Sequence, residues 1–158
     1  MAEKYTLSVL VENHFGVLAR VSGLISARAF NIDSLTVSTT EDPTISRMTI
    51  VVDADALKLE QVKSQLNRLI DVIEVQELKD GAFLDRELLL ARVSANGKTR
   101  AVVEELARRF GAKLVDTDDR SVVIEAAGDT KTLDQLVEQL RPHGITKLVR
   151  TGRVALER

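Results

Sequence analysis

Residues 11–35 read VENHFGVLARVSGLISARAFNIDSL and change their hydrophobic period twice. A strand with alternating apolar residues is predicted to end at Glu12, and a tight loop occupies residues 13–16. From Val17 the apolar residues follow the spacing i, i+1, i+4, i+7 and i+8, which predicts one apolar stripe on a helix. Asn31 then marks a predicted turn into a second strand.

The beginning of this predicted helix is a candidate binding site. The first N–H groups of a helix have no partner within it and carry the positive end of its dipole. A loop of Asn, Gly and small groups leading into such an end suits a carboxylate, and Gly16 leaves the backbone open to a ligand. We interpret loop 13–16 as the receptor for the carboxylate of a small amino acid. The alternative is an ordinary strand–helix connection, in which Asn13 caps the helix locally and Gly16 only permits a bend.

Neighbouring residues would complete such a pocket. Val17 and Leu18 supply an apolar wall, and Asn31 offers an amide at the far end of the same helix. If two chains meet there, Asn31 of one chain faces the loop of the other. The resulting pocket would suit a zwitterion with a short aliphatic side chain.

The first half of the chain is predicted to have the order βαββαβ. The predicted elements are strand 5–12, helix 17–28, hairpin 35–53, helix 56–70 and strand 72–78. Leu69 and Ile70 extend the apolar stripe of the second helix, and Ile73 and Val75 point inward from the last strand.

The same order recurs after a break at Lys79-Asp80-Gly81, without clear sequence identity between the halves. The predicted elements are strand 87–94, a helix with apolar residues 102, 103, 106 and 110, strands 112–116 and 121–127, a helix from residue 130 that stops at residue 142, and strand 145–150. Each half is thus predicted to be a ferredoxin-like, four-strand antiparallel sheet with two helices. The fold class is α+β, with domains at 1–79 and 80–158.

The size of these domains favours a homodimer. A unit of roughly 75 residues buries only about 60% of its unfolded surface, and its edge strands need covering. Pairing the second strand, near residues 35–39, with its copy in another chain would join two sheets. It would also bring two copies of loop 13–16 to the same seam.

The composition excludes several classes of protein. The 158 residues carry a net charge of −2 with only 3% aromatic residues, so neither a nucleic-acid surface nor a membrane surface is indicated. Cysteine is absent, which excludes disulfides and thiolate metal sites. The chain begins without the apolar core of a signal peptide and has no apolar run of transmembrane length, so we expect a cytoplasmic protein.

The sequence offers few candidate catalytic or metal-binding residues. His14 and His143 stand alone in predicted loops, which indicates solvated histidines rather than metal ligands. The acidic residues of segment 116–119 lack calcium-loop spacing and predict a charged hairpin turn. Arg47 is either a surface ion pair or a contact to a partner subunit. We predict no catalytic residues and no metal site.

Several motifs of the chain occur together. They are EN at 12–13, GVLARV at 16–21, GL at 23–24, FNIDSLTV at 30–37, SRMTI at 46–50, RELLL at 86–90 and RTGRVAL at 150–156. Together they resemble one known family, the small regulatory subunits of acetolactate (acetohydroxyacid) synthase. The resemblance covers nearly the whole chain. It implies an N-terminal ACT domain followed by a ferredoxin-like domain.

The resemblance also implies a function. Such a protein is not an enzyme itself; it activates a separate catalytic large subunit that uses thiamine diphosphate. It confers feedback inhibition by valine or a related branched-chain amino acid. Thiamine diphosphate, Mg²⁺ and FAD are then expected only in the catalytic subunit, with no cofactor in this chain.

The family's effector site carries over to Asn13, Gly16 and Asn31, with Val17 and Leu18 lining the same loop. His14 and Phe15, which lie between Asn13 and Gly16, are weak candidates for specificity. The chain departs from the family at Ala29, where glycine is usual before the aromatic residue, and this departure affects the predicted end of the helix.

One alternative function is a stand-alone ACT-type module that senses amino acids for another enzyme or regulator. The second half and the motif at 150–156 speak against it. A small enzyme on a ferredoxin-like fold would need a paired acid and base, and the sequence shows none.

Overall fold

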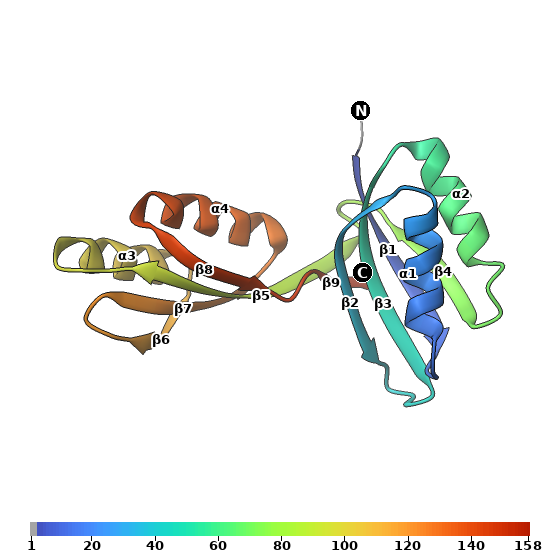
Figure 1. The fold of residues 1–158 in the computed structure, drawn as a ribbon, viewed down its shortest axis with the longest axis horizontal. Helices are drawn as coiled ribbons and strands as arrows, with labels where there is room; N and C mark the ends of the chain where they lie inside the picture. Colours follow the sequence, from blue (N-terminus) through green and yellow to red (C-terminus); the bar gives the residue numbers. More distant parts are fainter. Residues whose placement is uncertain (1–2) are drawn as a thin grey trace. The chain divides into compact units, whose positions relative to one another are not determined.

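The computed structural model describes residues 3–158 and divides the chain into two compact units (Figure 1). The first unit comprises Met1–Leu84 together with Arg153–Arg158, and the second comprises Asp85–Gly152. The predicted division after residue 79 did not assign the last residues of the chain to the first unit. None of the described helices is long and apolar enough to span a membrane.

The first unit contains a four-stranded antiparallel sheet of order β2-β3-β1-β4 with helices α1 and α2 on one face. Its elements are β1 (Glu3–Glu12), α1 (Val17–Ala27), β2 (Asn31–Thr39), β3 (Ile45–Ala54), α2 (Ala56–Leu66) and β4 (Val72–Leu78). This is the βαββαβ order that the sequence predicts.

The two faces of this sheet differ in chemistry. Leu7 and Val9 of β1 pair with Ile50 and Met48 of β3, and all four side chains are buried in the core beneath the helices. The opposite face carries hydroxyl side chains, because Thr6, Ser8 and Thr49 alternate with the core residues. These three residues are nevertheless only 3–4% exposed.

The second unit repeats the topology, with strands in the order β6-β7-β5-β8. Its elements are β5 (Phe83–Ser94), α3 (Lys98–Arg109), β6 (Lys113–Thr117), β7 (Ser121–Gly128), α4 (Thr130–Leu140), a 3-10 turn (Arg141–His143) and β8 (Ile145–Arg150). Strand β9 (Val154–Glu157) also pairs with β5, and the Arg158 N–H donates to the Ala82 carbonyl oxygen within the first unit. The predicted α+β class of two ferredoxin-like domains is confirmed.

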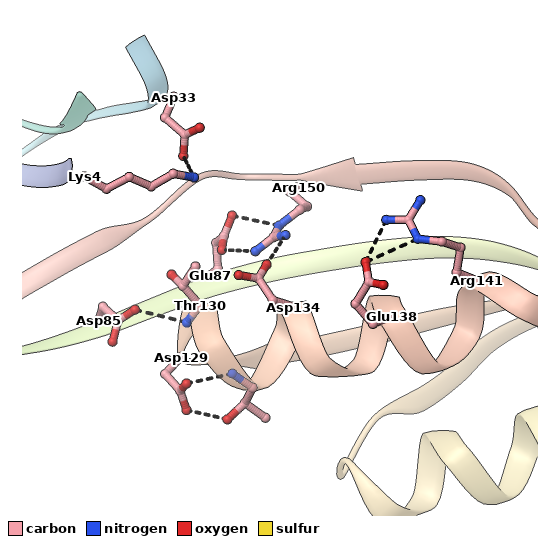
Figure 2. Close-up of polar contacts among 11 residues, drawn as sticks. Lys4, Asp33, Asp85, Glu87, Asp129, Thr130, Asp134, Glu138, Arg141 and Arg150 are labelled. Atoms are coloured by element: carbon pink, nitrogen blue, oxygen red, sulfur yellow. Dashed lines mark hydrogen bonds and ion pairs between the residues drawn. The ribbon is translucent and has the colours of Figure 1, made fainter. Parts of the chain in front are cut away.

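A nearly buried carboxylate organises one edge of the second unit (Figure 2). The Arg150 guanidinium donates to both carboxylate oxygens of Glu87, at 3.1 and 2.6 Å, and to Asp134 at 2.6 Å. The Glu87 side chain is only 6% exposed. These contacts connect β5, β8 and α4, and hydrogen bonds from Arg150 to Glu87 and Asp134 raise the pKa of the Arg150 guanidinium.

Several local predictions were wrong. Helix α2 ends at Leu66 rather than near Ile70, because the Asn67 side-chain amide donates to the Lys63 carbonyl and closes the last turn. Ile70 is consequently 94% exposed, and Ile73 is 53% exposed rather than inward-facing. Asn31 is the first residue of β2 and not a turn residue.

Strand β9 was not predicted, and β5 begins at Phe83, four residues earlier than expected. In α3, Val102 is 46% exposed, whereas Ala107 is fully buried in the apolar stripe. Strand β9 has only four residues, a length at which hydrophobic periodicity carries little information.

The departure at Ala29 has a structural consequence, since this residue adopts a φ of 59°. Its N–H donates to the Ser26 carbonyl and closes the end of α1 in a left-handed conformation, which favours glycine. We expect Ala29→Gly to raise the free energy of unfolding of the first unit by about 1 kcal/mol. Urea denaturation would measure the change.

Ala19→Gly is the matched control, because Ala19 lies within the same helix at an exposed position. There, glycine should lower stability by about 1 kcal/mol. Equal effects of the two substitutions would contradict the assignment of strain to Ala29.

Candidate functional site

The loop between β1 and α1 presents an open helix N-terminus. Gly16 is the N-cap residue with φ 81° and ψ −8°, and no side chain caps the helix. Phe15 is fully exposed and Leu18 is 46% exposed, whereas the Val17 side chain is buried in the core. Val17 therefore faces the loop with its backbone alone, and the apolar surface here belongs to Phe15 and Leu18.

Asn13 does not cap the helix. Its side-chain amide donates to the Pro43 carbonyl at 3.0 Å, and its N–H donates to the Thr44 carbonyl at 2.8 Å. Asn13 thus connects the loop to the β2–β3 turn. The alternative in which Asn13 caps α1 locally is wrong, and the N–H groups of the first helical turn stay open to a ligand.

Asn31 lies at the other end of α1 from Gly16. The helix has 11 residues, so about 16 Å separates its two ends. A single chain therefore does not bring Asn31 to the loop that holds Asn13 and Gly16. Only a second copy of the chain would supply Asn31 there.

Arg20 is a site residue that was not predicted from the sequence. A Cβ atom at Gly16 would lie 2.9 Å from Nη1 of Arg20, so the guanidinium lies directly against the glycine. Nη2 and Nε of Arg20 contact Oδ2 of Asp71 at 2.6 and 2.7 Å. The i, i+4 spacing of Gly16 and Arg20 was the available signal. A carboxylate at this loop would meet a guanidinium as well as the helix N–H groups.

His14 lies in the loop with its side chain 47% exposed, as predicted, but it also has two carboxylate partners that were not predicted. Its Nε2 lies 2.9 Å from Oδ1 of Asp71 and 3.1 Å from Oε2 of Glu12. The Asp71 side chain is only 7% exposed, and its backbone carbonyl accepts from the Glu12 N–H at 2.9 Å. Asp71 therefore fixes both His14 and Arg20 at the mouth of the loop.

Glu12, His14 and Asp71 hold three possible metal-ligand atoms within 4.8 Å of one another. The same Asp71 carboxylate is already paired with the Arg20 guanidinium. A cation would have to displace that positive charge, so the cluster is a salt-bridge network. In the predicted turn at residues 116–119, Asp118 accepts from the N–H groups of Arg120 and Ser121 at 2.7 and 2.8 Å, as expected of a charged hairpin turn.

These contacts make the contribution of His14 to folding stability depend on pH. Hydrogen bonds from His14 to the Phe15 carbonyl oxygen and to Glu12 raise the pKa of His14 above its usual value of 6.5. A raised pKa means that protonated His14 stabilises the folded state below pH 6.5, and that this contribution is lost as the pH rises through the folded-state pKa.

We expect the stability difference between wild type and His14→Gln to shrink as the pH rises from about 6 to about 8. Chemical denaturation at several pH values measures it. In an NMR titration, Glu12→Gln should lower the pKa of His14, because it removes one of the two carboxylates on Nε2. A stability difference that grows with pH would refute this role.

Comparison with known proteins agrees with this architecture. Residues 7–74 match the family described as the AHAS small subunit-like ACT domain, and residues 86–158 match the small subunit of acetolactate synthase. A probable acetolactate synthase small subunit of Archaeoglobus fulgidus is 48% identical over 155 residues, which cover 98% of this chain and 97% of that protein.

The acetolactate synthase small subunit of Mycobacterium leprae is 47% identical over 154 residues, with 98% of this chain and 91% of that protein covered. The crystal structure of the small subunit from Thermotoga maritima superposes with a TM-score of 0.88 at 29% identity, covering 99% and 98% of the two chains. The ACT fold of the first unit and the resemblance inferred from sequence are confirmed. The chain belongs to the family of acetolactate synthase small subunits.

Proposed function

We propose that this chain activates the thiamine-diphosphate catalytic subunit of acetolactate synthase and makes it sensitive to valine or another branched-chain amino acid. The observation that carries the proposal is the uncapped N-terminus of α1, where Gly16 has φ 81° and Arg20 lies against it. Helix N–H groups and a guanidinium together suit the carboxylate of an amino acid. The exposed Leu18 and Phe15 offer contacts for an aliphatic side chain.

The complete site requires a homodimer. Asn31 lies at the opposite end of α1, and β2, which begins at Asn31, is the edge strand of the first sheet. Pairing of two β2 strands would bring Asn31 of one protomer toward the loop of its partner. A ligand bound across this seam would favour one arrangement of the two protomers. A coupling of about 1–3 kcal/mol corresponds to a 5- to 150-fold change in the affinity of one site when the other is occupied.

In this proposal the chain is non-catalytic and acts in the cytoplasm. Thiamine diphosphate, Mg²⁺ and FAD belong to the large subunit. A stand-alone amino-acid sensor is the weaker candidate, because the match over residues 86–158 is to the small subunit of acetolactate synthase and not to a general sensing module.

Reconstitution tests the proposal. Purified chain is added to its catalytic subunit, and acetolactate formation is measured while valine, leucine and isoleucine are titrated. We expect stoichiometric chain to raise turnover and at least one of the three amino acids to lower it again. Turnover unchanged by the chain would refute activation, and turnover by the chain alone would refute its non-catalytic role.

A further inference from the structure

A hollow lies on the hydroxyl-rich face of the first sheet. Its volume is about 200 Å³, and β2 and β3 supply Thr36, Ser38 and Thr49. In the antiparallel register, Thr36 pairs with Thr49 and Ser38 pairs with Arg47, so these side chains lie on one face. That face is opposite to the face that packs against α1 and α2. The hollow is therefore separate from loop 13–16.

Arg47 is the charged group of this hollow. It is half-buried, and its Nη1 donates to the Ser8 hydroxyl at 2.7 Å. Within residues 3–158, no carboxylate lies within 4.0 Å of its guanidinium. Arg47 is therefore not a surface ion pair, which was one of its two predicted alternatives, and it lines a hollow of its own chain. The other alternative, a contact to a partner subunit, stays a prediction. A half-buried guanidinium held by a neutral hydroxyl keeps its remaining N–H groups for an anion, and a carboxylate matches them best.

The rest of the lining narrows the class of ligand. Glu41 is an exposed residue that lines the same hollow, together with Thr39 and Thr40. Val154 and Ala155, from the end of the chain, add the apolar part of the wall. Opposite charges on Arg47 and Glu41 fit a zwitterion, and the hydroxyl groups of β2 and β3 can form hydrogen bonds with a short polar side chain.

We propose that this hollow binds a small α-amino acid with a short polar side chain, of the size and chemistry of serine or threonine. The carboxylate of the ligand pairs with Arg47 and its ammonium group pairs with Glu41. The Ser8 hydroxyl is a positioning group, because it fixes Nη1 and directs the other guanidinium nitrogens. This site shares no residue with loop 13–16. A test of this proposal is therefore independent of a test of the proposed valine site.

The test uses the full chain labelled with ¹⁵N. L-serine is titrated, and backbone amide shifts report where it binds. We expect saturable shifts at residues 36–49 and none at residues 16–18, where a ligand at the start of α1 would bind. Serinol, which lacks the carboxylate, and glycerate, which carries a hydroxyl in place of the ammonium group, should each bind at least about tenfold more weakly.

Substitutions then identify the residues that pair with the ligand. Arg47→Gln should weaken serine at least about tenfold, Glu41→Gln should weaken it several-fold, and Ser8→Ala should have an intermediate effect. Arg68→Gln is the charge-matched control, because Arg68 is exposed on the first unit and does not line the hollow. The amide spectrum of each variant verifies its folding. Absence of saturable shifts, equal binding of glycerate, or unchanged affinity in folded Arg47→Gln would overturn the proposal.

Discussion

Gly16→Asp is expected to abolish valine inhibition of the reconstituted enzyme while leaving its activation largely intact. A side chain at φ 81° is strained by about 1–2 kcal/mol, and its Cβ would lie 2.9 Å from Nη1 of Arg20. The new carboxylate would occupy the position proposed for the carboxylate of valine, and it would draw the Arg20 guanidinium away from Asp71. The inhibition constant for valine should rise at least about tenfold.

Gly81→Asp is the matched control. Gly81 has the same φ of 81°, but no atom lies within 4 Å of the place that a Cβ would take there, so this variant reproduces the strain and charge away from the loop. Titration of valine against acetolactate formation compares the two variants. Full valine sensitivity in Gly16→Asp, or equal loss in Gly81→Asp, would contradict the site assignment.

Arg150→Met is expected to lower the free energy of unfolding of the second unit by about 3 kcal/mol. The substitution keeps much of the side-chain volume but leaves the Glu87 carboxylate, which is 6% exposed, without its guanidinium partner. The exposed pair between Arg141 and Glu138 is the internal comparison, since both side chains are 66–67% exposed. Arg141→Met should change stability by less than about 0.5 kcal/mol.

A double substitution separates desolvation from simple loss of a contact. If the unpaired Glu87 charge causes the loss, Glu87→Leu combined with Arg150→Met should recover most of the stability, because the pair is then replaced by apolar groups. Urea denaturation of all variants gives the comparison. A double variant no more stable than Arg150→Met alone would refute this explanation.

The fold was largely predictable because its signals are local. Alternation at Leu7, Val9 and Val11 and the helical stripe of Val17, Val21 and Ile25 are properties of short windows, and all six residues are buried. The pattern failed where the sequence offered only a few residues, as in the four-residue strand β9, or where an apolar residue such as Ile73 lies on an exposed face.

The candidate site was only partly predictable. Gly16 could be identified because only glycine readily adopts its conformation at the end of a loop. The contact between His14 and Asp71 joins residues 57 positions apart, and the amide of Asn13 reaches Pro43 across 30 positions. No periodicity encodes such pairs, since they depend on how β1, the β2–β3 turn and the segment before β4 meet in three dimensions.

The return of the chain to its first unit has a practical consequence. Residues 153–158 belong to that unit, and Nη1 of Arg153 donates to the Thr6 hydroxyl at 2.7 Å on the outer face of β1. A fragment ending near residue 84 would lack this covering strand and would expose a row of hydroxyls to water. An isolated first unit that keeps its native surface therefore needs residues 153–158 supplied again, for instance by circular permutation.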